Sequence, residues 1–245
     1  MTLRCQTFPS QVTPPKAAVV LCHGYGAPGS DLVGLYEPLV GLAPELKHAA
    51  FYFPEAPLSL SHLFGGDARA WWNLDMQAVA AAQRGDVEAL KELRHKEPEG
   101  MAHARASLKA LLDSICRDTG LPLSRIALGG FSQGAMLATD VALRLEEAPL
   151  GLVALSGTLL MEESWRARAQ KRQSLPVFQS HGTQDATLRF DAAQALRDVL
   201  ATAGLTVEFH AFDDGHTIPM TVLRSMAAFL GKLVNSLNKK ADVTP

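Results

Sequence analysis

Short apolar runs alternate with longer segments of helical periodicity along most of this chain. The runs are rich in Val, Ala, Leu and Phe, and they end at Gly, Pro or polar residues. Runs of this length and composition predict strands, and the first of them predicts a strand that is buried on both faces. They span residues 16–22, 49–53, 125–129, 150–155, 175–180 and 205–212.

Apolar residues spaced three and four apart predict the helices. Two of these stripes are followed within a few residues by a glycine, which is a typical helix stop. The predicted helices span residues 101–115, 135–145, 190–200 and 222–233. The polar residues from about 235 onward predict a tail that frays.

The alternation of strands and helices predicts the fold class, a mostly parallel central sheet with helices on both faces. A chain of 245 residues can form one such domain. Residues 61–100 depart from the pattern, because they hold a Gly-Gly pair, a Trp-Trp pair and two short helical pieces. They are too few for a domain of their own. We therefore expect one α/β domain over residues 1–245, with a helical excursion at about 61–100.

Composition narrows the class of protein. Hydrophobic residues make up 47% of the chain, and the formal net charge of −2 offers no basic field for nucleic acid or anionic membranes. No apolar run reaches the roughly 18 residues of a membrane span, and residues 2–16 lack the apolar core of a signal peptide. The three cysteines form no CxxC pair, which favours a reducing compartment. We expect a cytoplasmic enzyme without stable membrane association, and the sequence predicts no oligomeric state.

The strongest chemical motif is Gly130–Gly134 (GFSQG), which matches G-x-S-x-G. It lies between a predicted strand and a predicted helix, the context in which this motif forms the nucleophile elbow of an α/β-hydrolase fold. So tight a turn requires small residues on both sides of the serine and a strained serine backbone. Ser132 is therefore the candidate nucleophile, with its hydroxyl exposed above the sheet.

A serine hydroxyl needs a base, and three histidines follow Ser132 in the chain. His210 lies inside a predicted strand, where a sheet-face role is favoured. His181 lies at a strand end beside Gly182, where it could hold the backbone. His216 follows the last predicted strand, in a loop that can carry an imidazole over the sheet edge. The chain order typical of this fold, Ser then acid then His, also favours His216.

Asp185 is the favoured partner for His216. It lies in the loop after the fifth predicted strand, and so at the sheet edge expected for the nucleophile. Asp213 and Asp214 are alternatives, although their position favours turn formation or helix capping. Asp140 falls on the helix after the elbow and is expected on the surface.

A tetrahedral intermediate also needs backbone N–H donors. One is expected from Gln133, next to the nucleophile, and the other from Tyr25, in the loop after the first predicted strand. His23 in that loop precedes the serine, which is the wrong order for a base, and we expect it to be structural. No metal ligand set is predicted. Apolar residues of the excursion are the candidates to wall a modest substrate pocket: Leu63, Phe64, Trp71 and Trp72.

The chain resembles the phospholipase/carboxylesterase family, which includes the acyl-protein thioesterases. The resemblance implies esterase or thioesterase activity, a triad that works without a cofactor, and oxyanion donors at Tyr25 and Gln133. It also implies that Trp71 or Trp72 helps to line the acyl site. The segment 77–100 is longer than in the acyl-protein thioesterases. The matching motifs occur in family order: 21–24 (LCHG), 54–57 (PEAP), 130–134 (GFSQG), 155–157 (LSG), 181–182 (HG) with Asp185, and 215–216 (GH).

Three functions compete. The first is a serine carboxylesterase that hydrolyses small to medium acyl esters or thioesters through an acyl-enzyme on Ser132. The second is a lysophospholipase or acyl-protein thioesterase that acts on long acyl chains and needs a long apolar groove. The third is a catalytically inactive binding protein of the same fold, a class that usually lacks a triad member. The helical pieces of the excursion carry few apolar residues among many charged ones, which favours the first function.

Overall fold

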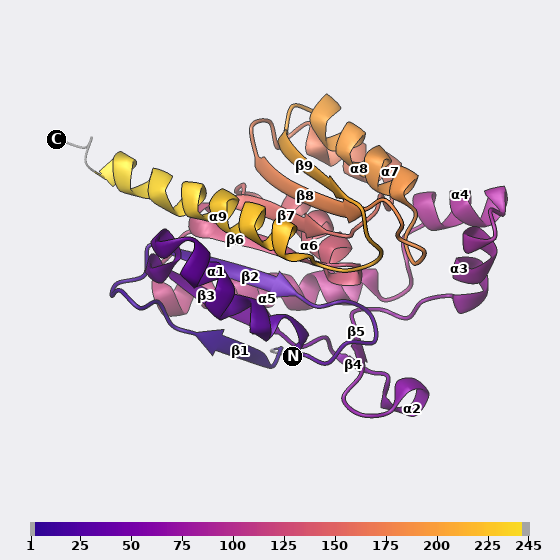
Figure 1. Ribbon diagram of the computed structural model, residues 1–245, viewed down its shortest axis with the longest axis horizontal. Helices are drawn as coiled ribbons and strands as arrows, with labels where there is room; N and C mark the ends of the chain where they lie inside the picture. Colours follow the sequence, from indigo (N-terminus) through magenta and orange to yellow (C-terminus); the bar gives the residue numbers. More distant parts are fainter. Residues whose placement is uncertain (1–2, 242–245) are drawn as a thin grey trace.

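A central sheet of seven strands organises the computed structural model, which describes residues 3–241 (Figure 1). The strand order is β1-β3-β2-β6-β7-β8-β9, and only the β1–β3 pair is antiparallel. A separate antiparallel ribbon pairs β4 with β5. The strands are β1 (Cys5–Phe8), β2 (Ala17–Cys22), β3 (Ala49–Pro54), β4 (Leu58–Ser59), β5 (Arg69–Ala70), β6 (Ile126–Phe131), β7 (Gly151–Leu155), β8 (Pro176–Gly182) and β9 (Thr206–Phe212).

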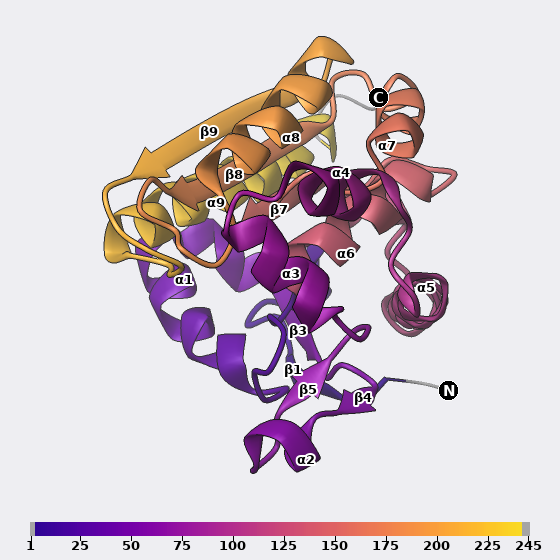
Figure 2. The same ribbon diagram turned by 90° about the vertical axis from the view of Figure 1, so that its right-hand side faces the viewer.

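Helices connect the strands and flank the sheet (Figures 1 and 2). The α-helices are α1 (Tyr36–Leu42), α2 (Ser61–Phe64), α3 (Met76–Gln83), α4 (Val87–His95), α5 (Met101–Thr119), α6 (Gln133–Arg144), α7 (Glu162–Ala169), α8 (Phe190–Thr202) and α9 (Met220–Ala241). Three short 3₁₀ helices are η1 (Asp31–Leu35), η2 (Pro44–His48) and η3 (Leu123–Arg125).

The two faces of the sheet belong to two hydrophobic clusters. Side chains alternate between the faces along a strand, so Val20 joins one cluster and Val19 the other. Helices α5, α6, α7 and α8 pack on the Val20 face, and α1 and α9 pack on the Val19 face. The expected fold class, a mostly parallel sheet with helices on both faces, is confirmed. This is the architecture of an α/β hydrolase.

The side of the sheet to which the chain adds strands changes between β2 and β6. After β2 the chain places β3 on one side of β2, between β2 and the edge strand β1, whereas β6 lies on the other side of β2 and is followed outward by β7, β8 and β9. The two strands are paired in parallel up to Cys22 and Gly130. In open α/β sheets, ligands bind in the crevice beyond the carboxyl ends of strands at such a switch point. The loop after β2 and the G-x-S-x-G turn after β6 therefore meet where a site is expected.

The excursion is more than a pair of helices. It contains α2, the β4–β5 ribbon that the sequence did not predict, and then α3 and α4. Both ribbon views show α4 beside α7, with α3 packed next to α4 (Figures 1 and 2). Arg94 of α4 donates from Nε to Glu162 of α7 at 2.5 Å, and Gln83 of α3 donates from Nε2 to the carbonyl of Thr187 at 3.4 Å. These contacts hold the excursion against the carboxyl end of the sheet.

The structure corrects two expectations about the chain ends. Strand β1 was not predicted, because its four residues are only half apolar and its backbone pairs with a distant segment, β3. Helix α9 continues to Ala241, so the tail expected to fray from about 235 is wrong within the described part of the chain. The helix persists because Val234 and Leu237 still pack on the cluster below it. The last four residues of the expected tail, 242–245, lie outside the described residues.

Candidate active site

Ser132 occupies the sharp turn between β6 and α6. Its backbone angles are φ 55° and ψ −119°, a conformation that costs a non-glycine residue energy and that commonly marks a functional site. The turn is held on both sides, since Ser132 N–H donates to the Leu155 carbonyl at 2.8 Å and its carbonyl accepts from Met136 N–H at 3.1 Å. The strained elbow expected from the motif is present.

The glycines of the motif are required by close backbone contact. A Cβ on Gly134 would lie 2.1 Å from the carbonyl oxygen of Cys22, and one on Gly130 would lie 2.5 Å from the same atom. Real Cβ atoms do not approach a backbone oxygen so closely. Only glycine at both positions lets the elbow sit directly against the end of β2.

The loop after β2 is brought beside the elbow. An added Cβ on Gly24 would be 3.3 Å from the Phe131 ring and 3.4 Å from the Cβ of Ser132. Tyr25 follows in this loop, and Gln133 is the first residue of α6, where backbone N–H groups have no partner within the helix. Of the residues expected as oxyanion donors, Gln133 thus follows the serine directly, and Tyr25 follows Gly24, which lies against the serine.

Buried hydrogen bonds brace this loop. His23 accepts from Ala56 N–H at Nε2 (3.1 Å), so its Nδ1 carries the hydrogen that is shared with the Gly24 carbonyl at 2.8 Å. Burial lowers the pKa of His23, which keeps the ring neutral. The indole N–H of Trp71 donates to the His23 carbonyl at 2.9 Å. His23 is therefore structural, as the chain order predicted.

The Gln133 side chain connects the elbow to the two tryptophans. Its Oε1 accepts from the backbone N–H of Trp71 at 2.9 Å, and its Nε2 donates to the carbonyl of Trp72 at 2.8 Å. Both indoles are about 1% exposed and belong to the core. They contact the elbow and the loop after β2 from the core and expose almost no surface, and the lining role expected for them stays a prediction.

Open apolar surface near the elbow comes from α2 instead. Leu63 and Phe64 are each 59% exposed, and the Phe64 ring packs edge-on against Tyr25 with ring centres 6.0 Å apart. The same ring lies 3.9 Å from a Cβ built on Gly26. Of the four expected pocket residues, these two lie exposed beside the loop that follows β2.

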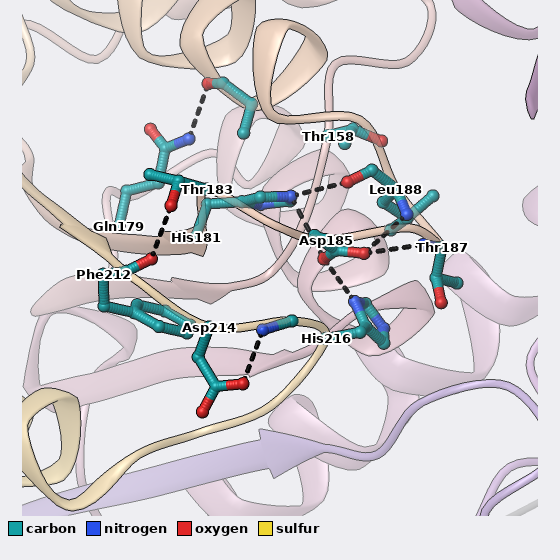
Figure 3. Close-up of polar contacts among 12 residues, drawn as sticks. Thr158, Gln179, His181, Thr183, Asp185, Thr187, Leu188, Phe212, Asp214 and His216 are labelled. Carbon is teal, nitrogen blue, oxygen red and sulfur yellow. Dashed lines mark hydrogen bonds and ion pairs between the residues drawn. The ribbon is translucent and has the colours of Figure 1, made fainter.

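Asp185 and His216 are joined by a short hydrogen bond. Nδ1 of His216 donates to Oδ2 of Asp185 at 2.6 Å (Figure 3). The His216 ring also packs against Phe131, the residue before the serine, with ring centres 4.7 Å apart. Ser132 and His216 make no hydrogen bond with each other in the described structure. Catalytic contacts of this kind commonly tighten only once substrate is bound.

The Asp185 carboxylate is buried and surrounded by donors. Its Oδ1 accepts from the N–H groups of Thr187 and Leu188, each at 2.8 Å. Burial alone would raise the pKa of this carboxyl, but hydrogen bonds from His181, His216 and Leu188 outweigh burial and hold the pKa well below its usual range. The group is therefore an anion that can orient His216 and stabilise its charged form.

The competing acids have other partners. Asp213 accepts from Gln184 Nε2 at 2.7 Å, and Asp214 accepts from Gly215 N–H at 2.7 Å, so both shape the loop, as their turn-forming position indicated. Asp140 corrects an expectation: it is fully buried, not on the surface, because Arg144 and the indole N–H of Trp165 both donate to its Oδ1 at 2.8 Å.

The two other histidines that follow Ser132 have different partners. His210 bonds Glu208 at 2.7 Å on the exposed side of β9, in keeping with a sheet-face role. His181 contacts the carboxylate of Asp185, which the sequence analysis did not anticipate. The spacing of four residues between His181 and Asp185 was the available signal.

Fold and elbow together define a serine hydrolase of the α/β-hydrolase class. A family model described as phospholipase/carboxylesterase matches residues 4–234. The chain belongs to this family, and it hydrolyses carboxylic ester or thioester bonds.

Three similar proteins illustrate the relationship. Acyl-protein thioesterase 1 of Yarrowia lipolytica is 30% identical over 200 residues, covering 79% of this chain and 82% of that protein. Acyl-protein thioesterase 1 of Neurospora crassa is 26% identical over 231 residues, covering 92% and 90%. The crystal structure of esterase PE8 superposes with a TM-score of 0.79 at 26% identity, covering 95% of this chain and 100% of that one.

Proposed function

We propose that Ser132, His216 and Asp185 form the catalytic triad of a carboxylesterase for small to medium acyl esters or thioesters. The observation that carries the proposal is the 2.6 Å hydrogen bond from His216 to Asp185, beside the strained elbow that bears Ser132. Since Nδ1 of His216 donates to Asp185, its Nε2 is free to accept a proton from the serine hydroxyl.

The reaction then follows from these groups. Ser132 Oγ attacks the acyl carbon while His216 Nε2 takes its proton, and the carbonyl oxygen becomes an oxyanion facing the N–H groups of Tyr25 and Gln133. His216 returns the proton to the leaving alcohol or thiol, and the acyl group stays on Ser132. A water molecule, deprotonated by the same imidazole, releases the acid. Asp185 stays ionised throughout and stabilises the imidazolium.

A fluorophosphonate probe, which labels activated serines covalently, tests the nucleophile. Wild type is expected to be labelled and to hydrolyse p-nitrophenyl butyrate, whereas Ser132→Ala should do neither while keeping its thermal unfolding temperature. Ser156→Ala is the matched control, because Ser156 also has a positive φ (48°) but is fully buried. Labelling that persists in Ser132→Ala would contradict the assignment.

The acid is tested separately. Asp185→Asn should lower kcat on the order of 10⁴-fold, as it does in a well-studied triad, because the amide holds the imidazole in the wrong tautomer. Asp214→Asn should change kcat less than about twofold, because its contact is to a neighbouring backbone N–H. A larger loss at Asp214 than at Asp185 would exchange their roles.

One observation favours the second candidate function, hydrolysis of long acyl chains. Leu63 and Phe64 form an exposed apolar pair beside Tyr25, and relatives named acyl-protein thioesterases carry that name for acyl-protein substrates. We keep the small-to-medium proposal because this pair is small and the two tryptophans are buried.

We further propose a cytoplasmic location. The three cysteines form no disulfide, and Cys22 lies fully buried in β2, which supports a reducing compartment. Among residues 3–241, no helix is long and apolar enough to cross a bilayer. Fractionation of cells that express the full chain tests this location.

A further inference from the structure

We propose that His181 is a positioning residue for the reaction: its Nε2–H holds the Oδ2 oxygen of Asp185 in line with His216. The inference rests on the proposed triad, and it adds to that triad a second imidazole on the far side of the acid. His181 touches neither the substrate nor the reacting atoms, and it acts only through Asp185.

Asp185 lies between two imidazole rings in Figure 3. His181 comes from the end of β8 and approaches Oδ2 to 3.2 Å, whereas His216 comes from the loop after β9 and approaches the same oxygen to 2.6 Å. The side chains of His181 and Asp185 are both fully buried. No water from bulk solvent can therefore replace the contact that His181 makes.

The hydrogen-bond partners settle which nitrogen of His181 carries the hydrogen. Nε2 faces two acceptors, the carboxylate of Asp185 and the carbonyl of Leu188, the latter at 2.9 Å. Neither can donate, so Nε2 must. Nδ1 is buried and has no hydrogen-bond partner in the described part of the chain, so it carries no hydrogen in the neutral ring. His181 thus carries one hydrogen that is shared between the Leu188 carbonyl, at 2.9 Å, and Oδ2 of Asp185, at 3.2 Å.

This donor completes the carboxylate's shell. Oδ1 accepts two backbone N–H groups, and Oδ2 accepts the two imidazoles, so that about four acceptor positions are filled. Leu188 takes part twice, since its N–H donates to Oδ1 and its carbonyl accepts from His181. The His181 imidazole therefore connects the Leu188 carbonyl with the Asp185 carboxylate. Removing the imidazole leaves Oδ2 of Asp185 free to turn away from His216.

His181→Leu removes the donor and keeps an apolar side chain of similar bulk, and His181→Gln restores an N–H donor that reaches about as far from the backbone. His181→Leu should lower kcat about 10- to 100-fold, the loss expected when a catalytic group is misplaced by about 1 Å. KM should change less than about threefold, because no substrate contact is lost. His181→Gln should recover most of the lost kcat.

The pH profile supplies a readout that a merely structural role would not move. Without the His181 donor, Oδ2 of Asp185 is free to turn away from His216, so the carboxylate stabilises the protonated, inactive form of His216 less. The acid limb of kcat/KM should therefore move to lower pH in His181→Leu and return in His181→Gln. Other charged groups nearby are engaged elsewhere: Asp213 bonds Gln184 and Asp214 bonds Gly215. The Phe131 and Phe190 rings, against His216 and His181, carry no charge.

His210→Leu is the matched control, because His210 is bonded to Glu208 on β9 and lies outside the machinery. It should leave kcat and the acid limb unchanged. Equal loss in His181→Leu and His181→Gln, or no shift of the acid limb in His181→Leu, overturns the inference. Asp185→Asn, measured in parallel, separates the two proposals. If it keeps full activity, the triad itself is wrong; if it is inactive while His181→Leu is normal, only the role of His181 fails.

Discussion

The same residue type has different chemistry at neighbouring positions of this site. Asp185, Asp213 and Asp214 all lie in loops at one sheet edge, yet only Asp185 is buried with donors on both of its oxygens. Asp213 and Asp214 make exposed contacts within the loops. Burial with a full set of donors, and not the presence of a carboxylate, distinguishes Asp185 from the two aspartates that shape turns.

Acid stability should depend on Asp185. Because its folded-state pKa lies below its unfolded value, its contribution to folding is fully present above the unfolded pKa and is lost as pH falls toward the folded one. The free energy of unfolding of wild type should therefore fall from about pH 5 downward, and Asp185→Asn should show a flatter curve. Urea unfolding at several pH values measures this. Asp191→Asn, at an exposed ion pair, should leave the slope nearly unchanged.

The elbow should not tolerate a methyl group. Gly134→Ala places a Cβ against backbone atoms of Cys22 and His23, at 2.1 and 2.5 Å, so the loop or the elbow must shift. We expect a destabilisation of about 1–3 kcal/mol or more and a loss of kcat. Gly41→Ala in α1 is the control. Nothing lies within 4 Å of its added Cβ, and it should stabilise by about 0.5–1 kcal/mol. Equal urea midpoints for the two variants would contradict this account.

Three helices on the Val20 face of the sheet meet at one buried carboxylate. Asp140 of α6 accepts from Arg105 of α5, from Arg144 of its own helix and from the indole of Trp165 on α7. Arg105 also reaches Glu97, so the network extends to the segment just before α5. The carboxylate thus fixes how α5 and α7 lie against the helix that follows the nucleophile.

Removal of this carboxylate should be costly. Asp140→Ala leaves two arginines and an indole N–H without their shared acceptor, and breaking a buried pair in this way costs about 3–5 kcal/mol. Asp113→Ala removes an exposed partner of Lys109 one helical turn away and should cost no more than about 0.5 kcal/mol. Thermal and urea unfolding compare the two. A loss below about 1 kcal/mol for Asp140→Ala would show that the network adds little to stability.

At the scale of the whole molecule, the site is assembled at the switch point of the sheet. In the proposed mechanism, the end of β2 supplies the oxyanion loop, the end of β6 the nucleophile, the end of β8 the acid, and the loop after β9 the base. Helices α2, α3 and α4 of the excursion flank this edge (Figure 2). Chain segments that are far apart in sequence therefore determine which substrates fit.

The acyl chain length that the protein prefers should be limited by the small apolar surface at the carboxyl end of the sheet. Each buried methylene contributes roughly 0.8 kcal/mol, so kcat/KM for p-nitrophenyl esters should rise with acyl length only until the pocket is full. Leu63→Ala and Phe64→Ala should flatten this rise. Val87→Ala, at an exposed apolar residue of α4, should not. Rates should show no jump where the substrate exceeds its solubility. A steady gain out to palmitate, or a sharp jump at that limit, would favour the long-chain function.

Much of the fold was predictable because its signals are local. Six strands are recognisable from the sequence as apolar runs, five of them buried, and the elbow is recognisable as a motif of five consecutive residues. The edge strand β1 was not predicted, because only half of its four residues are apolar and it forms a strand by pairing with β3. The ribbon β4–β5 was missed for the same reason.

The sequence by itself determined the parallel α/β architecture and the elbow at Ser132, since strand periodicity and glycine spacing are properties of the chain. Chain order likewise predicted His216 and Asp185 as the partners that we propose for Ser132. Only the tertiary structure decided that Asp140 is a buried hub, that the two tryptophans support the site from the core, and that His181 meets Asp185. These outcomes depend on burial and on contacts between the ends of different strands. The physical reason is that desolvation and hydrogen-bond geometry exist only once the sheet has brought those ends together.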